Sequence, residues 1–283
     1  MGKISKMFKG IEQEPVKQIP MHFDVYGSPS NPSLVLMHGM LMDGSMMKPL
    51  VDRLKDRYYL IVPTMHGSMG EKETTFRSID GEAACIEDYV IENLNGHLDG
   101  FYGISMGATV AWSVLEHDRI RVDKAVLDGL YVAHQGLWCA YFTSTMMYEM
   151  HHQIALGNRN YKIPFMMKYC GVMMGYGQEK MRRMLEDNFT ANDVTFGNMR
   201  RVGYYEYTYR VNPDAAVNDT EVRMWCGSKE PYAKKSDRIA MSHIRHCREE
   251  VFQGYSHGDL MSVHPDQCAE CIRRFMEGRE YHS

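Results

Sequence analysis

The chain has 283 residues, of which 44% are hydrophobic and 24% are charged. These fractions are ordinary for globular proteins, so the composition excludes a disordered, collagen-like or coiled-coil chain. The 32 basic and 36 acidic residues leave a net charge of −4, which argues against a nucleic-acid partner because phosphate binding needs a basic surface. At roughly 150 residues per domain, the length allows one large domain or two small ones.

Three features of the sequence bear on its location. No stretch reaches the roughly 18 uncharged apolar residues of a membrane span. The first ten residues hold three lysines and lack the apolar segment of a secretory signal. The seven cysteines are an odd number spread thinly over the chain, unlike those of a disulfide-stabilised secreted domain. We therefore expect a cytoplasmic protein with reduced cysteines.

Apolar runs alternate with amphipathic segments in two parts of the chain. In the first part, strands are predicted at 21–26, 33–37, 58–62, 98–102 and 124–127, with Pro63 ending the third. Helices are predicted between them at 44–56, 78–94 and 108–115. After residue 216 the pattern resumes with strands at 221–226 and 249–252, a helix at 231–246, and a last helix with its cysteines on an apolar stripe.

Alternating strands and helices predict an α/β fold with a mostly parallel central sheet flanked by helices. Residues 131–215 break the alternation, because they form helical segments rich in methionine and aromatic residues. We therefore predict a core made of residues 1–130 and 216–283, with residues 131–215 inserted as a helical cap.

The strongest local motif is G-x-S-x-G, present here as Gly103-Ile104-Ser105-Met106-Gly107. It lies between the predicted strand 98–102 and the predicted helix 108–115, as this motif requires. The two glycines allow a tight turn with Ser105 at its apex, and the N-terminus of the following helix favours a developing oxyanion. Ser105 is therefore the predicted nucleophile; the alternative is an ordinary serine in a strand–helix turn.

A serine at its free pKa is a weak nucleophile, so it needs a base that a third group orients. His257 is the strongest of the 13 histidines, since it lies in the loop between the last predicted strand and the last helix. From that loop, at the carboxyl edge of the sheet, His257 can reach Ser105. His243, His246 and His264 are interpreted as surface histidines.

The third group is expected to be a carboxylate in a loop at the same edge. Glu230 follows the strand 221–226 and is the predicted acid. Asp128 follows the strand 124–127 and is the alternative acid, although an aspartate before Gly129 is also typical of a simple turn. Asp237 stays open as a further candidate.

The order nucleophile, acid, histidine and the alternating elements together resemble the α/β-hydrolase fold family. The resemblance extends from about Met21 to Glu277, with only the cap lacking motif support. Residues 36–40, Leu-Met-His-Gly-Met, are similar to the family's HG-x turn. This resemblance implies that the backbone N–H groups of Met40 and Met106 form the oxyanion hole.

Two departures from the family pattern are present. Residues 63–67 are similar to the family's loop after the next strand, but Thr64 and Met65 replace the usual charged residue. Glu230 stands where many members carry aspartate, so the triad that the resemblance implies is Ser-His-Glu.

The resemblance implies a serine hydrolase that cleaves a carboxylic ester or related acyl compound through an acyl-enzyme, with no metal or organic cofactor. The same triad would also serve a C–C bond hydrolase or a perhydrolase. A reading from another class is a non-catalytic ligand-binding protein of the same fold. The sequence names neither the substrate nor the oligomeric state.

The 25 methionines bear on the substrate, which we expect to be a small apolar acyl compound. Many of them cluster in the cap, where flexible, polarisable side chains can line an apolar pocket. The clusters are Met146, Met147 and Met150, then Met166 and Met167, then Met173 and Met174. The alternative is that they only pack the cap helices onto the core. Cys268 and Cys271 are likewise interpreted as residues that pack the last helix against the core. His151 and His152 are not expected to bind a metal.

Overall fold

Seven strands form one sheet in this computed structural model, which describes residues 2–17, 19–40, 42–71, 73–157, 174–177, 180 and 194–279. The spatial order is β1-β3-β2-β4-β5-β6-β7. The strands are β1 (His22–Tyr26), β2 (Ser33–Met37), β3 (Tyr59–Thr64), β4 (His97–Ile104), β5 (Arg121–Asp128), β6 (Val217–Gly227) and β7 (Ile244–Phe252). The edge strand β1 runs antiparallel to β3, and every other pairing is parallel. The carboxyl ends of β4, β5, β6 and β7 therefore share one edge.

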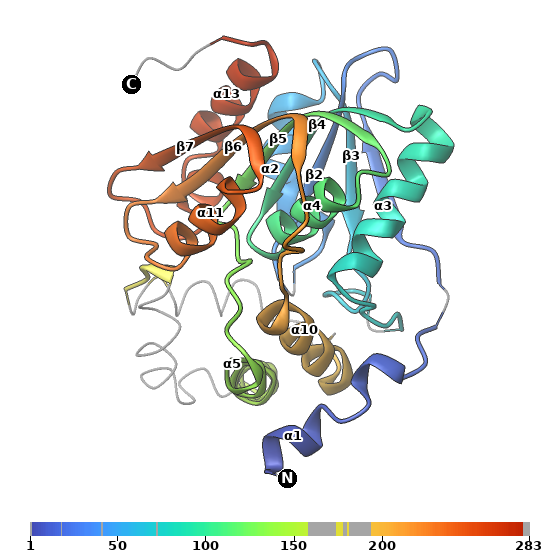
Figure 1. The fold of residues 1–283 in the computed structure, drawn as a ribbon, viewed down its shortest axis with the longest axis vertical. Helices are drawn as coiled ribbons and strands as arrows, with labels where there is room; N and C mark the ends of the chain where they lie inside the picture. Colours follow the sequence, from blue (N-terminus) through green and yellow to red (C-terminus); the bar gives the residue numbers. More distant parts are fainter. Residues whose placement is uncertain are drawn as a thin grey trace.

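Helices cover both faces of the sheet (Figure 1). On one face lie α3 (Ile79–Leu94), α4 (Met106–His117) and α11 (Ala233–Met241). On the other face lie α2 (Lys48–Leu54), α12 (Asp259–Ser262) and α13 (Pro265–Met276). A short 3-10 helix, η2 (Gly44–Met47), precedes α2. This is the predicted α/β architecture, and α3 begins at the side-chain cap of Ser78.

Burial explains why the central strands are continuous apolar runs in the sequence. All five residues of β2 are buried. Val35 and Met37 pack under α3 and α4, whereas Leu34 and Leu36 pack under α2 and α13. Because successive side chains in a strand point to opposite faces, a strand covered on both faces is apolar except where a polar group finds a partner, as Ser33 does with Asp99. Cys268 and Cys271 are buried with Leu34 and Leu36 in the core under α2 and α13, as their place on the apolar stripe predicted.

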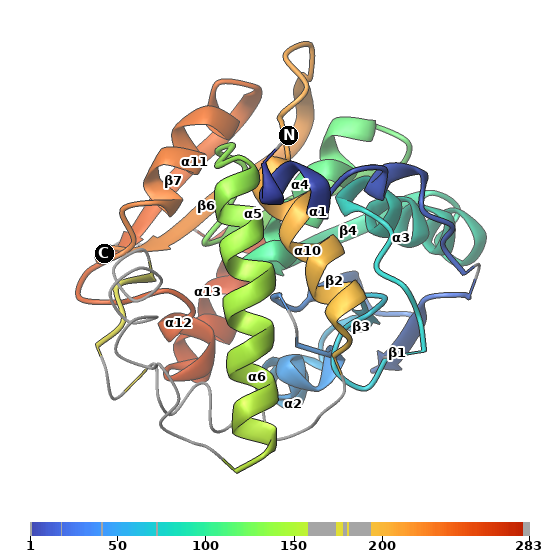
Figure 2. The same cartoon turned by 90° about the horizontal axis from the view of Figure 1, so that it is seen from below.

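The segment between β5 and β6 contributes further helices. α5 (Leu137–Phe142), the π-helical turn η3 (Thr143–Met147) and α6 (Tyr148–Ala155) form one long rod, and α10 (Phe196–Thr208) lies beside it (Figure 2). The chain start packs there too, with α1 (Lys3–Met7) and the 3-10 helix η1 (Ile11–Gln13). The buried guanidinium of Arg201 fixes α10 by donating to the carbonyl oxygens of Ile11, Phe76 and Arg77.

Several element boundaries differ from the sequence-based prediction, and β3 and α11 show two of the causes. β3 continues through Pro63 to Thr64, because the pairing of β3 with β2 ends at Ile61 and a residue without an N–H is tolerated beyond it. The predicted helix 231–246 is too long: α11 ends at Met241, and β7 begins at Ile244. β7 is an edge strand with exposed charged residues, so its amino half lacks the apolar run that marked the central strands.

None of the described helices is long and apolar enough to cross a membrane.

Candidate active site

Ser105 occupies the turn between β4 and α4. Its φ is 57° and its ψ is −125°, a backbone conformation that residues with a Cβ rarely adopt. The flanking glycines permit this turn: a Cβ at Gly103 would lie 2.4 Å from the Gly107 carbonyl oxygen, and one at Gly107 would lie 2.4 Å from that of His38. The sequence motif thus corresponds to a turn that only these residue types can form.

Backbone groups at the ends of β2 and β5 lie next to Ser105. The Ser105 N–H donates to the Asp128 carbonyl oxygen at 2.8 Å. The HG-x turn is next to it, since a Cβ at Gly39 would lie 3.4 Å from Ser105 Cβ. Met106 is the first residue of α4, so its N–H has no acceptor within the helix. Met40 follows directly after Gly39, and its N–H has no hydrogen-bond partner in the described part of the chain.

His257 and Glu230 form a buried pair in the loops after β7 and β6. His257 Nδ1 lies 2.6 Å from Glu230 Oε2, and Glu230 Oε1 accepts the Gly227 N–H at 2.6 Å. Burial disfavours the imidazolium, but the Glu230 charge, its hydrogen bond and the charge of Asp128 together raise the pKa of His257. Both carboxylate oxygens of Glu230 are therefore occupied, one by the ring and one by the backbone of its own loop.

A short segment between β5 and β6 holds the His257 loop in place. The His257 N–H donates to the Met174 carbonyl oxygen at 2.9 Å, and the Tyr176 hydroxyl donates to the His257 carbonyl oxygen at 2.7 Å. The Ser256 hydroxyl donates to the Gly175 carbonyl oxygen at 2.8 Å. Three consecutive residues of the predicted cap thus make hydrogen bonds to His257 and its neighbour Ser256.

Asp128 lies close by but has a different partner. Its Oδ2 accepts the Tyr102 hydroxyl at 2.7 Å. Burial, followed by the charge of Glu230, raises the pKa of Asp128 to about 7. The neighbouring Gly129 has no room for a side chain, because a Cβ there would lie 2.6 Å from His257 Cε1. Since the Asp128 carbonyl also binds the Ser105 N–H, the Asp128–Gly129 turn lies against both Ser105 and the imidazole.

The structure thus gathers Ser105, His257 and Glu230 at the carboxyl edge of the sheet. Within the described residues, no hydrogen bond joins Ser105 Oγ to His257, and His257 Nε2 has no hydrogen-bond partner. Catalytic hydrogen bonds are often long before substrate binds. Asp237 is not part of this group, because it lies on α11 and makes no hydrogen bond to His257.

Sequence reasoning did not identify two residues of this site, Tyr131 and Tyr176. The Tyr131 ring packs edge-on against His257, with 5.4 Å between the ring centroids. Both tyrosines lie in the predicted cap, where no motif marks them. Their only signal in the sequence is the general richness of that segment in aromatic residues.

Two more buried histidines lie at the same edge in structural roles. His38 Nδ1 donates to the Gly39 carbonyl oxygen at 2.8 Å, and its Nε2 accepts the Met65 N–H at 3.0 Å. Burial lowers the pKa of His38 to about 4, so it joins the two loops as a neutral ring. His66 instead pairs with the buried Glu82, at 2.9 Å from Nδ1 to Oε2.

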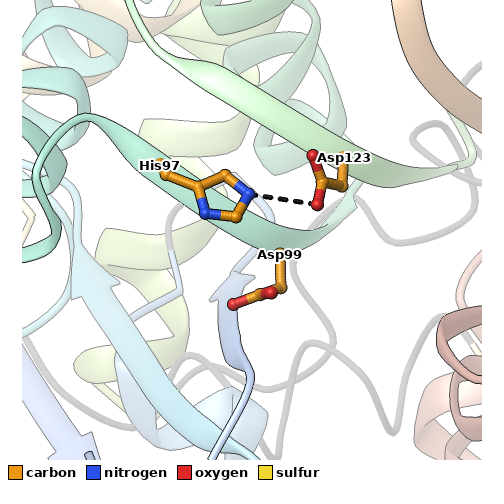
Figure 3. Close-up of side chains that lie close together, drawn as sticks. All are labelled: His97, Asp99 and Asp123. Carbon is orange, nitrogen blue, oxygen red and sulfur yellow. Dashed lines mark hydrogen bonds and ion pairs between the residues drawn. The ribbon is translucent and has the colours of Figure 1, made fainter.

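A separate polar cluster lies near the amino ends of β4 and β5, far along the strands from Ser105 (Figure 3). His97 Nε2 lies 3.0 Å from Asp123 Oδ2, and Arg121 Nε donates to Asp123 Oδ1 at 2.8 Å. Asp99 accepts the Ser33 N–H at 2.8 Å. These carboxylates are already paired, so the cluster supplies no reactive group.

No protein-family model matches the sequence, and no curated protein sequence matches it. Many solved structures are nevertheless similar to it. An α/β-hydrolase family protein from Desulfitobacterium hafniense is 20% identical with a TM-score of 0.79, covering 90% of this chain and 100% of that chain. The enol-lactonase from Burkholderia xenovorans LB400 is 16% identical with a TM-score of 0.65, covering 93% and 100%. A thermophilic esterase from Thermogutta terrifontis is 16% identical with a TM-score of 0.63, covering 91% and 93%. The chain therefore has the α/β-hydrolase fold.

Proposed function

We propose that this protein is a serine hydrolase that cleaves a carboxylic ester or a related acyl compound. The observation that carries the proposal is the buried His257–Glu230 pair beside the strained Ser105 turn. The strained backbone at Ser105 costs stability, which suggests that the serine is kept for its function. The imidazole of His257, whose Nε2 has no hydrogen-bond partner among the described residues, can serve as its base. Two of the similar structures are named as an esterase and an enol-lactonase, which fits ester chemistry.

In the proposed mechanism, Ser105 Oγ attacks the ester carbonyl while His257 Nε2 accepts its proton. Glu230 holds the Nδ1–H and stabilises the imidazolium that forms. The N–H groups of Met40 and Met106 bind the tetrahedral oxyanion, and the imidazolium then returns the proton to the leaving alcohol. In the second half, His257 activates a water that hydrolyses the acyl-enzyme and regenerates Ser105.

We assign the acid role to Glu230 rather than Asp128. Glu230 is the carboxylate that bonds His257 Nδ1, whereas the Asp128 carboxyl accepts from Tyr102. Asp128 then acts on the pair through its charge and through its carbonyl bond to the Ser105 N–H.

We further propose that residues 131–215 form a cap over this site and that its substrate is an uncharged ester with a short to medium acyl chain. The contacts of Met174 and Tyr176 with His257 support a cover at this edge. Met146 and Met147 lie in the π-helical turn η3, and Met174 lies beside His257. Met166, Met167 and Met173 are outside the described residues.

The reaction class is tested with a fluorophosphonate probe on the purified protein. Wild type should gain one probe mass on the peptide that contains Ser105, whereas Ser105→Ala should lose both labelling and ester turnover. Equal labelling of the alanine variant would remove Ser105 from the nucleophile role. A folded wild type that neither labels nor turns over esters would favour a non-catalytic binding protein instead.

The acyl preference is tested separately with p-nitrophenyl esters from acetate to laurate beside a succinate half-ester. An apolar pocket predicts that kcat/KM depends on chain length and is lowest for the anionic ester. Indifference to chain length, or a preference for the half-ester, would contradict the pocket while leaving the triad assignment intact.

A further inference from the structure

Three side chains with metal-binding atoms meet behind the Glu230 loop. Cys226 lies near the end of β6, Asp237 on α11 and Glu249 on β7. The Cys226 sulfur and one oxygen of each carboxylate all lie within 4.8 Å of one another. Cys226 and Asp237 are buried, and Glu249 is exposed, so the group is open to solvent on one side.

Asp237 is the unusual member of this group. It is 0% exposed, and neither of its carboxylate oxygens has a hydrogen-bond partner of ordinary geometry among the described residues. The Cys226 thiol, a weak donor, is the one side chain whose hydrogen bonding favours the Asp237 charge. Burying a carboxylate without strong donors is costly. Native proteins rarely bury a polar group without a partner, so we infer that the Asp237 carboxylate has a partner that the described residues do not supply.

The charges around Asp237 point to a cation as that partner. The carboxylate of Glu249 has one oxygen within 4.8 Å of the Asp237 carboxylate and adds a second acidic group to the cluster. Lys234 is the nearby basic residue, but its ammonium donates to the Ser228 carbonyl oxygen at 3.1 Å. The group thus has more acceptors than cations.

We propose that Cys226, Asp237 and Glu249 bind a divalent transition-metal ion of the Zn²⁺ type. A thiolate favours zinc-like ions over Mg²⁺ and Ca²⁺, and carboxylates are regular zinc ligands. Three protein ligands leave the fourth tetrahedral position to water, on the exposed Glu249 side. Binding releases the thiol proton of Cys226, and any proton on Asp237, to solvent, so affinity increases with pH.

The site would have a structural effect on the loop beside it. Cys226 immediately precedes Gly227, whose N–H binds Glu230 Oε1. A bound ion would therefore join β6, β7 and α11 where the Glu230 loop begins. This inference is independent of the proposed hydrolase activity, because none of the three ligands touches Ser105 or His257 through a hydrogen bond in the described residues.

The cluster of His97, Asp99 and Asp123 provides the contrast. It also brings three metal-binding side chains together, yet Asp123 is paired with His97 and Arg121, and Asp99 with Ser33 (Figure 3). Because an ion there would have to displace existing partners, we assign no site to this cluster and use it as the control.

The test uses the full chain, stripped with a chelator and titrated with Co²⁺ as the probe. Wild type should show a thiolate-to-cobalt charge-transfer band that saturates at one equivalent, with a rise in Tm. Cys226→Ser should abolish the band. Glu249→Gln changes an exposed residue and should preserve the fold while weakening Co²⁺ binding at least about tenfold. Asp123→Asn and Cys85→Ser, in the control cluster and on α3, should bind as wild type does.

Several outcomes would overturn the proposal. They are a folded wild type with no charge-transfer band, a band that persists in Cys226→Ser, and unchanged affinity in Glu249→Gln. If Cys226→Ser does not fold, the Glu249→Gln titration decides alone. An equal loss of binding in Asp123→Asn would place the ion in the other cluster.

Discussion

Among the described residues, two buried histidine–glutamate pairs have the same geometry at Nδ1 and differ in what the other ring nitrogen, Nε2, faces. In both pairs, Nδ1 faces a buried glutamate, at 2.9 Å for His66–Glu82 and 2.6 Å for His257–Glu230. His66 Nε2 faces the Ile19 carbonyl oxygen at 2.9 Å, so both of its nitrogens face acceptors. His257 Nε2 has no hydrogen-bond partner among the described residues.

This difference assigns opposite roles to the two rings. A ring with acceptors on both nitrogens is stabilised as the imidazolium, so Glu82 and the Ile19 carbonyl both favour the protonated form of His66. A ring with one acceptor and one open nitrogen can stay neutral and take up a proton. Both rings have a glutamate at Nδ1, so what Nε2 faces is the difference between the structural His66 and the candidate base His257.

The largest expected contrast comes from removing each imidazole. His257→Ala should lower kcat/KM by on the order of 10⁴-fold. It also removes the ring partner of the buried Glu230, so the free energy of unfolding should fall while the protein still folds. His66→Ala should lower that free energy by about 3–5 kcal/mol, because it leaves the buried Glu82 without its ring partner. Ester kinetics and urea unfolding of both variants measure this. A stable but inactive His66→Ala would reverse the two roles.

The next effect separates the two acids near His257. In Glu230→Gln the amide oxygen must face the Gly227 N–H, so its NH₂ faces His257 Nδ1 and forces the proton onto Nε2. We expect a loss of about 10³–10⁴-fold in kcat. Asp128→Asn should lose less than about tenfold, because it removes only a charge and keeps an oxygen that can accept from the Tyr102 hydroxyl. The opposite ranking, in folded variants, would transfer the acid role to Asp128.

A rise in pH should increase the activity that depends on His257 and decrease the stability that depends on His66. The raised pKa of His257 places the acidic limb of kcat/KM above the ordinary value of 6.5, so activity falls as pH drops through it. Asp128→Asn should move that limb to lower pH, because the Asp128 charge raises the His257 pKa.

For His66, burial opposes protonation, but the Glu82 hydrogen bond and charge raise its pKa. Its contribution to stability is therefore complete below about pH 6.5 and lost as pH rises through the folded-state value. The stability difference between wild type and His66→Gln should shrink as pH rises, measured by urea unfolding between about pH 5 and pH 9. A difference that grows with pH would contradict the imidazolium assignment.

The smallest expected effect concerns the segment that holds His257. Tyr176→Phe removes the hydroxyl bond to the His257 carbonyl, so kcat should fall by about two- to tenfold with KM little changed. Tyr255→Phe is the matched control, since its hydroxyl bonds Gln267 and not the His257 backbone. Equal losses in both variants, or a change in KM alone, would mean that Tyr176 does not position the base.

Sequence reasoning predicted the parts of this fold that local physics decides. β2 matches its predicted range because a strand buried on both faces is mostly apolar. α3 matches because its hydrophobic spacing and its Ser78 cap are both local. The Ser105 turn could be located because its motif is local and the contact that excludes a Cβ at Gly103 lies within the turn, although the contact at Gly107 comes from the distant His38.

The features that the sequence did not reveal depend on distant partners. Glu82, in the first turn of α3, meets His66 in the loop after β3. Arg201 meets carbonyl groups of the chain start and of the loop before α3. The early start of β7 at Ile244 was missed because the amino half of this edge strand carries exposed charged residues and has no apolar run. Such pairings carry no periodicity or motif, so they become visible only when the chain is folded.

The backbone at Ser105 has a consequence for how this protein can evolve. Of the described residues, three besides glycine have a positive φ, and Asn95 and Asp118 are short polar residues that close α3 and α4 in the left-handed helical region. Ser105 lies outside that region, where a Cβ costs on the order of 1–3 kcal/mol. Drift towards a more stable chain would therefore replace Ser105 with glycine first. A lineage that retains serine here must be under selection for its hydroxyl group, so comparing natural variants at this one position would report on function without any assay.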